Sequence, residues 1–306
     1  MPASGETAED ISIASVVVKP GILLGGDLNI VSPTTEYDSA FLALTISSGA
    51  AHKYLSSLAQ GKSVVHLHNA DIQSVSAKFP TKREQEKIHL LFGKIDTLIT
   101  LHQRKYEKLV NIKKSMLDKM FPQNGASMPE IRFKGFTDPW EQRKLGDLCV
   151  EFRSGEFISA SDITETGEYP VFGGNGLRGF TDRFNHDGEY TLIGRQGALC
   201  GNVNFAVGKS YFTEHAIAVR ADKKNQTRFL YYLFSTMDLG QYSGQSAQPG
   251  LAVGNLVELK STLPDKQEQE KISGVLTALD TLITLHQRKL EKLQNIKKAC
   301  LEKMFV

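Results

Sequence analysis

The 306-residue sequence contains little cysteine and almost no net charge. Its cysteines, Cys149, Cys200 and Cys300, lie far apart and form no CxxC pair. An odd number of scattered cysteines argues against a disulfide framework and a structural zinc site, and it favours a reducing compartment. The formal net charge of +2 neither requires nor excludes nucleic acid as a partner, because local patches of charge decide such binding.

Long apolar runs are also absent from the sequence. The most apolar early stretch, residues 11–26, is interrupted by Lys19 and Pro20, so it is too short to span a bilayer. The first residues, MPASGETAED, are acidic and lack the basic region of a secretory signal. A hydrophobic fraction of 41% and a charged fraction of 23% are ordinary for globular domains. We therefore expect a cytoplasmic globular protein.

The sequence also lacks the usual signatures of catalysis. Residues 174–179 satisfy GxGxxG, but they precede a predicted strand and turn instead of the helix that a dinucleotide site needs. Lys62 and Ser63 end a segment like a phosphate-binding loop, yet Ser56 stands where its first glycine belongs. Because no supporting ligand accompanies the few histidines, we expect no metal, no cofactor and no catalytic residue.

What the sequence does contain is a long internal repeat. The decamer DTLITLHQRK occurs at residues 96–105 and again at 280–289. At the same offset FPTKREQEKI faces LPDKQEQEKI, and the segments EKL, NIKK and KMF also recur. Upstream the match fades to apolar pairs such as Leu67 with Leu251. A match of this length indicates an internal duplication.

Each copy of the repeat predicts one long helix. Thr81 with Glu84, and Asp265 with Glu268, have capping-box spacing behind a proline. Apolar residues then recur at heptad spacing over about four heptads, which predicts that the two helices pack as a coiled coil. The predicted helix–helix interface comprises Ile95, Leu98, His102, Leu109, Ile112, Leu279, Leu282, His286, Leu293 and Ile296.

The HQRK cluster in the middle of each copy has two interpretations. It can be a solvated helix face, which is the common role of such charge runs. Alternatively His102 and His286, both at the first heptad position, meet each other or face a partner subunit.

The segments outside the helices differ in length and character. Residues 123–264 are rich in glycine, aromatic and β-branched residues, which predicts a β-rich domain with one helix at residues 228–242. Residues 1–80 predict a helix near residues 37–59 and a short strand region before Phe79. Being the shorter segment, they correspond only to the later part of such a domain.

Three glycine-rich loops, at residues 173–180, 194–202 and 244–250, carry hydrogen-bonding side chains. Arginine can pair with guanine, and glutamine or asparagine with adenine, although ordinary β-turn composition also explains such loops. The candidate base contacts are Asn175, Arg178, Arg195, Gln196, Gln245 and Gln248. The candidate phosphate contacts, which would position DNA without specifying its sequence, are Lys209, Lys223, Lys224 and Arg228.

Taken together, these segments resemble the specificity (S) subunits of type I restriction-modification systems. The resemblance rests on FKGFTDPWEQRKLGDL, YPVFGGNGLRGF, the EQEKI start of each helix and the LHQRK-x-EKL-x-NIKK pattern within it. It covers residues 80–306 and, more weakly, 1–79. It implies an α+β fold in which β-rich target-recognition domains are separated by two long helices, with an antiparallel coiled coil and an internal pseudo-twofold repeat.

The resemblance also implies a domain division. The expected parts are a truncated first recognition domain at 1–80, a spacer helix at 81–122, a complete second recognition domain at 123–264 and a second spacer helix at 265–306.

The function that the resemblance implies is non-catalytic. Each recognition domain reads half of a bipartite double-stranded DNA site, the helices dock modification (methyltransferase) subunits, and restriction (motor-nuclease) subunits join later. Shortened S chains can pair through their helices, so a homodimer is a further expectation. The alternatives are an assembly protein or an inactive recombination cassette with no sequence reading of its own.

Overall fold

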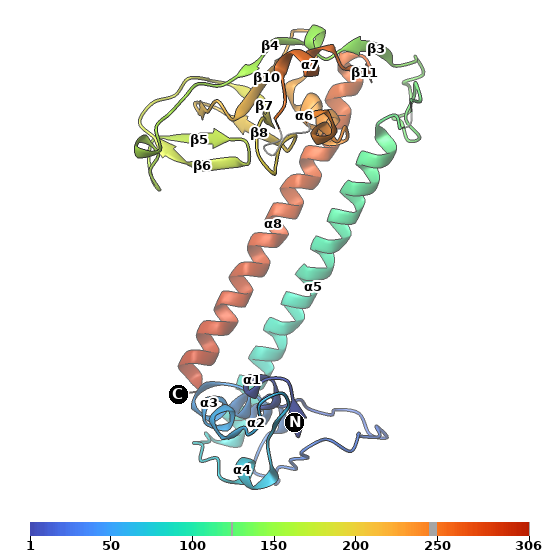
Figure 1. Cartoon of the computed structure of the whole chain (residues 1–306). Helices are drawn as coiled ribbons and strands as arrows, with labels where there is room; N and C mark the ends of the chain where they lie inside the picture. The colour runs from blue at the N-terminus through green and yellow to red at the C-terminus, as the bar shows by residue number, and fades with distance from the viewer. Residues whose placement is uncertain (124, 245–249, 306) are drawn as a thin grey trace. The chain divides into compact units, whose positions relative to one another are not determined.

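The structure is a computed structural model that describes residues 1–123, 125–244 and 250–305 (Figure 1). The chain forms two compact units. The first unit contains Met1–Glu107 and Thr284–Val306, and the second contains Lys108–Ile283. Within the described part of the chain, no helix is both long and apolar enough to cross a membrane.

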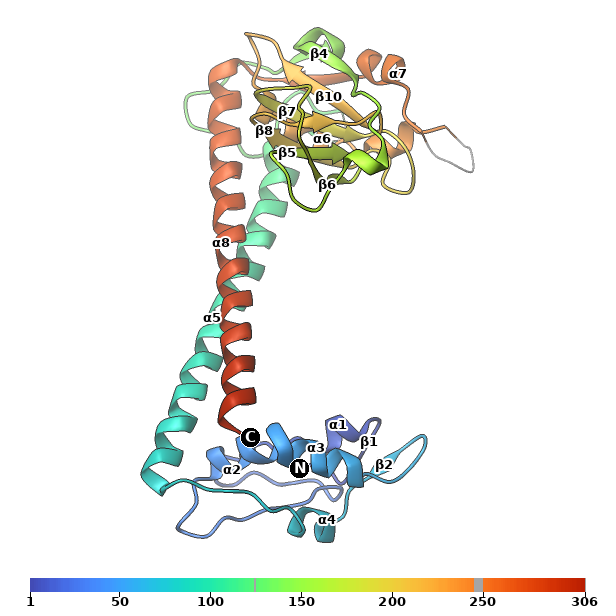
Figure 2. The same ribbon diagram turned by 90° about the vertical axis from the view of Figure 1, so that its left-hand side faces the viewer.

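The second unit is built around an antiparallel sheet with the strand order β4-β10-β7-β8 (Figure 2). The central strands β7 and β10 are almost wholly buried, which explains why both read as continuous apolar runs in the sequence. Helix α6 packs on β7, β8 and β10. The elements are β4 (Cys149–Ser154), β7 (Glu189–Gly194), β8 (Val203–Val207), β10 (Ala216–Ala221) and α6 (Thr227–Ser235).

Two smaller sheets complete the second unit. A β5–β6 hairpin pairs with β9, which runs parallel to β5, and β3 pairs with β11. The β-rich fold predicted here is confirmed, although the predicted helix ends at Ser235 and a separate 3₁₀ turn follows at Leu239–Tyr242. The remaining elements are β3 (Glu141–Lys144), β5 (Tyr169–Gly173), β6 (Gly176–Thr181), β9 (Tyr211–Phe212), β11 (Lys260–Leu263) and α7 (Val253–Glu258).

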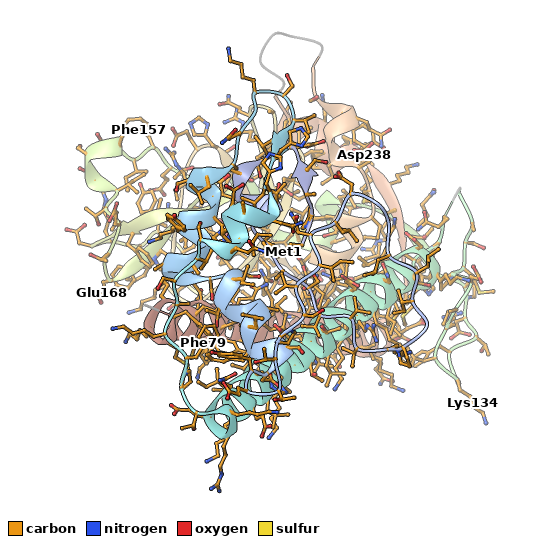
Figure 3. All side chains as sticks on the ribbon, turned by 90° about the horizontal axis from the view of Figure 1, so that it is seen from below. Met1, Phe79, Lys134, Phe157, Glu168 and Asp238 are labelled. Carbon is orange, nitrogen blue, oxygen red and sulfur yellow. The ribbon has the colours of Figure 1, made fainter. Side chains whose placement is uncertain are left out.

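The N-terminal part of the first unit is mostly helical. Phe79, labelled in Figure 3, packs edge-on against Tyr37 with ring centroids 4.8 Å apart. The short strand expected before Phe79 lies further upstream, at β2. The elements are β1 (Ser4–Gly5), α1 (Ala8–Ile11), α2 (Ser39–Ile46), α3 (Gly49–Leu58), β2 (Val65–His66) and α4 (Asn69–Gln73).

The single helix predicted near residues 37–59 is two helices, because Gly49 interrupts it. Gly49 has a φ of +61°, a conformation that favours glycine. A Cβ atom at this position would lie 1.6 Å from the backbone oxygen of Phe305. The chain therefore turns between α2 and α3 at the point where Phe305, which follows the C-terminal helix, contacts it.

The repeats form two helices of equal length, α5 (Lys82–Met120) and α8 (Lys266–Met304). They pack antiparallel in both units. In the first unit the Asp96 carboxylate lies 2.6 Å from the Lys297 ammonium, and in the second the Lys113 ammonium lies 2.5 Å from Asp280. The predicted coiled coil and internal repeat are thus confirmed.

The heptad register of the buried seam differs from the prediction. Leu98, Leu282 and Ile296 were expected in the interface, but their exposed fractions are 43%, 42% and 41%. In α5 the more buried line is Phe92, Ile95, Ile99, His102, Tyr106 and Leu109, alternating at spacings of three and four residues. The other predicted interface residues, Ile95, His102, Leu109, Ile112, Leu279, His286 and Leu293, are buried or half-buried.

The physical reason for the error is that two lines of residues both fit heptad spacing after Ile95. The line through Leu98 continues at heptad spacing to Lys105, whose side chain is exposed. The adjacent line contains Ile99 and Tyr106 at the equivalent positions, and its larger apolar surface decides the packing.

Both units dock onto their long helix by the same hydrogen bonds. The Asp38 backbone N–H donates to Gln85 Oε1 at 2.9 Å, and the Gln226 N–H donates to Gln269 Oε1 at 3.0 Å. Each glutamine Nε2 in turn donates to the carbonyl of the proline before its helix. Since Asp38 and Gln226 are the N-caps of α2 and α6, these two helices are equivalent elements of the duplication.

Candidate nucleic-acid interface

Four loops of the second unit meet at one end of the four-stranded sheet. The Arg195 backbone N–H donates to the His215 carbonyl at 2.8 Å, and the Leu251 N–H donates to the Arg195 carbonyl at 2.8 Å. Asn202 Nδ2 lies 3.4 Å from Asn175 Oδ1. These bonds connect the β5–β6 turn, the β7–β8 loop, the β9–β10 link and the segment before α7. We call this region the loop cluster.

Glycine is required where the loops approach most closely. A Cβ atom on Gly194 would lie 2.4 Å from the Gly174 carbonyl oxygen, and one on Gly174 would lie 2.9 Å from the His215 oxygen. Both contacts are to backbone, which cannot move aside as a flexible side chain can. The glycines therefore let backbones meet and bring side chains from separate loops onto one surface.

The loop cluster collects all the predicted base contacts that the structure describes. Asn175 and Arg178 come from the β5–β6 hairpin, and both are exposed. Arg195 and Gln196 begin the β7–β8 loop, where Arg195 is half-buried and Gln196 is exposed. The predicted contacts Gln245 and Gln248 lie outside the described residues.

Three polar residues of the cluster were not predicted from the sequence. His215 Nδ1 is 2.9 Å from Gln196 Oε1, and His215 Nε2 is 3.2 Å from Glu214 Oε1. Glu214 Oε2 and Asn204 Nδ2 are buried and have no hydrogen-bond partner in the part of the chain that the structure describes. Leaving such a group unpaired in a dry interior costs about 1–3 kcal/mol.

No local signal in the sequence identifies these three residues as part of the cluster. Asn204 lies within strand β8 and His215 just before β10. These residues lie in the loop cluster because of the order of the strands in the sheet, and the spacing of residues in the sequence does not reveal that order.

The cysteine near the cluster has no features of a nucleophile. Cys200 Sγ donates to the Arg195 carbonyl at 3.2 Å, and burial raises the pKa of its thiol. In the sheet, burial raises the pKa of Cys149 to about 12. Both thiols therefore remain protonated near neutral pH, and thiolate is the reactive form.

The predicted phosphate contacts lie at the opposite end of the sheet from the loop cluster. Lys209 follows β8, and Lys223 and Lys224 follow β10, at the ends that face away from Gly194. The length of these strands separates the two sets by about 15–20 Å. The structure does not bring the lysines and the candidate base contacts onto one loop surface.

Arg228 is already engaged within the second unit. Its Nη2 lies 3.0 Å from Glu189 Oε1, and its guanidinium lies 4.1 Å from the centre of the Phe205 ring. Lys209 is similarly placed, with its ammonium 4.8 Å from the centre of the Phe184 ring. Binding phosphate through Arg228 would require it to leave an ion pair, so we expect a smaller contribution from it than from Lys223 or Lys224.

The exposed surface of the helix pair carries leucines that recur with the repeat. Leu98 and Leu101 on α5 correspond to Leu282 and Leu285 on α8. All four are exposed, and they lie outside the buried seam. We call them the repeated leucines. The repeat thus places the same pair of exposed leucines on both helices.

Comparison with known protein families identifies the family of the chain. Residues 137–295, which include the loop cluster and most of α8, match the family model described as "Type I restriction modification DNA specificity domain". This match covers more than half of the chain. The chain belongs to this family.

Curated relatives of the specificity family agree with this assignment. The type I restriction enzyme EcoprrI specificity subunit of Escherichia coli is 44% identical over 156 residues, which cover 50% of this chain and 39% of that protein. The MjaVIII specificity subunit of Methanocaldococcus jannaschii is 21% identical over 311 residues, covering 92% of this chain and 72% of that protein. The chain thus spans less than half of the first relative.

Solved structures of specificity subunits share the fold. The S subunit from M. genitalium superimposes with a TM-score of 0.70 at 19% identity, covering 89% of this chain and 73% of that one. A structure described as showing complex assembly and conformational transition of the type I R-M system gives a TM-score of 0.53 at 18% identity. At such identities the likeness supports the architecture alone.

Proposed function

We propose that the chain is the non-catalytic specificity subunit of a type I restriction-modification complex and reads double-stranded DNA through the loop cluster. The observation that carries this proposal is the convergence of Asn175, Arg178, Arg195 and Gln196 on one surface of a chain of the specificity family. Their side chains are the types that pair with guanine and adenine in the major groove. Since one unit carries the cluster, it would read one half-site.

The helices would dock the modification subunits that supply catalysis. The repeated leucines support this part of the proposal, because the same apolar surface occurs on both helices. Two copies of one partner could therefore bind in the same way. The restriction subunits would join through this assembly, and pairing of two chains through their helices would supply a second loop cluster.

A gel-shift comparison at fixed salt tests sequence reading. Purified chain with modification subunits is presented with random duplexes, and the preferred sequence is selected. Arg178→Ala and Arg195→Ala should each weaken binding to that sequence by about 5- to 150-fold, because a bidentate base contact contributes about 1–3 kcal/mol. Binding to unrelated duplexes should change little, since phosphate contacts dominate it.

The matched control is Arg143→Ala, which removes a half-buried arginine on β3, away from the loop cluster. It should leave the preference unchanged. The proposal fails if the wild-type complex shows no preference among random duplexes, or if both cluster variants keep the wild-type preference.

An assembly protein or inactive recombination cassette is the second candidate. It is favoured by the first unit, in which none of the described residues forms a hairpin like β5–β6. Under this alternative, complexes of the arginine variants would form normally and neither they nor the wild type would distinguish DNA sequences.

A further inference from the structure

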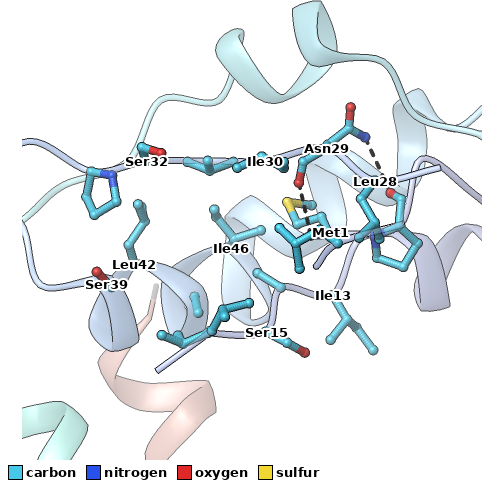
Figure 4. A pocket seen from close by; sticks show the side chains of 18 residues that line it. Met1, Ile13, Ser15, Leu28, Asn29, Ile30, Ser32, Ser39, Leu42 and Ile46 are labelled. Carbon is cyan, nitrogen blue, oxygen red and sulfur yellow. Dashed lines mark hydrogen bonds between the residues drawn. The ribbon is translucent and has the colours of Figure 1, made fainter. Parts of the chain in front are cut away.

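Polar groups that could bind a ligand are distributed unevenly between the two units. The first unit contains a cavity of about 450 Å³, whose lining side chains are apolar apart from serines and Asn29 (Figure 4). The Asn29 amide already donates to two backbone carbonyls. Hydrogen-bonding side chains from separate segments meet instead in the loop cluster, where His215 contacts both Glu214 and Gln196.

His215 links an acidic side chain to a candidate base contact. Its Nε2 lies 3.2 Å from Glu214 Oε1, and its Nδ1 lies 2.9 Å from Gln196 Oε1. A carboxylate and an amide oxygen can only accept hydrogen bonds, so both imidazole nitrogens must donate in this arrangement. Only the imidazolium form of histidine has two N–H groups. The geometry therefore describes a cationic His215 whose charge is balanced by Glu214.

The backbone around this contact is fixed by several hydrogen bonds, while its side chains are accessible. The His215 carbonyl accepts from the Arg195 N–H at 2.8 Å, and the His215 N–H donates to Thr213 Oγ1 at 3.3 Å. Gln196 forms an isolated antiparallel bridge with Gly250. The His215 side chain is 41% exposed, and Gln196 is exposed. A rigid backbone thus presents the Gln196 amide at the surface.

The charge of His215 decides how the Gln196 amide is turned. Cationic His215 donates to Oε1, which leaves Nε2 facing outward as a donor and one lone pair of Oε1 free. Neutral His215 keeps its proton on Nε2 beside Glu214, so Nδ1 can only accept. Gln196 must then turn its amide over and donate from Nε2 to His215. Its outward edge exchanges donor and acceptor positions.

The orientation that cationic His215 holds matches one base. Adenine presents the N7 acceptor beside the N6 amino donor, and glutamine pairs with them through Nε2 and Oε1. Guanine offers two acceptors at the same positions and cytosine offers only a donor, so either would oppose one end of the amide. Because the backbone of Gln196 is fixed, turning the amide over would misplace both groups.

The charged surroundings of His215 also bear on its protonation. The segments packed against His215 carry two acidic and two basic side chains, namely Glu214, Glu156 after β4, Arg178 in β6 and Arg195 in the β7–β8 loop. These charges are equal in number. The direct contact with Glu214 and the phosphates of bound DNA therefore favour the cation, because nearby negative charge stabilises it.

We propose that His215 is a positioning residue for DNA reading. As an imidazolium paired with Glu214, it holds the Gln196 amide in the orientation that pairs with adenine. Gln196 touches the base, and His215 acts through Gln196. This inference rests on the proposed function of the loop cluster, and it names the base that one of its side chains reads.

Adenine reading is tested with the complex of the full chain and modification subunits on its preferred duplex. Each adenine is replaced in turn by 7-deazaadenine, which lacks the N7 acceptor. At about pH 6, one replacement should weaken binding by the wild type by about 2- to 12-fold, the contribution of one hydrogen bond. The same replacement should not affect Gln196→Ala, and it thereby identifies the adenine that Gln196 reads.

The pH profile of this effect separates positioning from packing. For the wild type, the effect should shrink to less than about twofold at about pH 8.5, because histidine is then neutral and the amide is turned over. His215→Phe cannot donate, so its effect should be small at both pH values. His215→Lys donates at both, so it should keep the full effect at both. Replacements at the other adenines should act alike in all variants, which shows that the loop cluster is intact.

Two results would overturn the inference while leaving DNA reading in place. One is a preferred duplex in which no 7-deazaadenine replacement affects the wild type and spares Gln196→Ala. The other is the same pH profile for the wild type, His215→Phe and His215→Lys. A wild-type complex with no sequence preference at all would overturn the proposed function as well, and this is measured first.

Discussion

The contact between His102 and His286 in the helix seam makes the stability of the helix pair depend on pH. His102 Nδ1 and His286 Nδ1 are 2.8 Å apart, so only one proton can lie between them. Burial, His102 and the nearby Lys105 and Lys289 together lower the pKa of His286. The folded seam therefore favours neutral His286, whereas the unfolded chain protonates it at its ordinary pKa.

This arrangement predicts that acid destabilises the helix pair. Stability from the pair is complete above the ordinary histidine pKa of about 6.5 and falls as pH decreases toward the lowered folded value, because the unfolded state then binds more protons. Thermal unfolding followed at pH 8 and pH 5 measures the effect. The double variant His102→Leu and His286→Leu should show a smaller difference between the two pH values. An unchanged difference would show that other groups dominate.

At the scale of elements, the buried glutamines determine how each unit attaches to its long helix. Gln85 and Gln269 are almost fully buried, and each uses both ends of its amide. Each glutamine accepts from the N–H of a helix N-cap and donates to the carbonyl of the proline before its own helix. It therefore fixes both the position and the direction of the short helix against the long one. The short helix and the long helix can therefore pack in only one orientation, because any other orientation would leave a buried polar group unpaired.

Removing such an amide predicts a measurable loss of stability. Gln269→Ala leaves the Gln226 N–H and the Pro264 carbonyl unpaired, so the free energy of unfolding should fall by about 1–3 kcal/mol. Urea denaturation followed by the fluorescence of Trp140, which lies in the core of the second unit, measures it. Gln267→Ala, at an exposed position of the same helix, is the control and should change the free energy little.

The helices themselves could be predicted closely, while their seam could not. Proline before each copy, capping-box spacing and the absence of a second proline predict the start and length of α5 and α8. The choice between Leu98 and Ile99 as seam residues depends on the summed burial of two whole lines of side chains. Spacing is the same for both, so the pattern alone cannot distinguish them.

At the scale of the whole molecule, duplication was the most informative property of the sequence. It predicts paired helices and equivalent flanking domains. It could not predict the loop cluster, since Gln196 and His215 meet only because β7 and β10 are neighbours in the sheet. For the same reason Lys223 and Lys224 could not be assigned to either end of the strands.

Assembly through the repeated leucines is the prediction that belongs to this scale. Leu98→Asp with Leu282→Asp should reduce copurification of modification subunits by about tenfold or more, because each charge would be buried without a partner in the contact. Leu90→Asp is the matched control, since Leu90 is exposed on α5 and its repeat partner is Gly274. Equal loss in the control would point to general damage to α5, and no loss in the double variant would exclude this surface as the docking site.

The antiparallel seam has a genetic consequence, because nearly the same peptide forms both of its sides. Crossing-over between the two DNA segments that encode the repeats would delete 184 codons. The product would encode one helix, which begins as α5 and continues in frame as α8. Such a helix carries a seam complementary to itself, with its central histidine facing the same histidine of another chain. The deletion product would therefore form a twofold symmetric pair of identical chains.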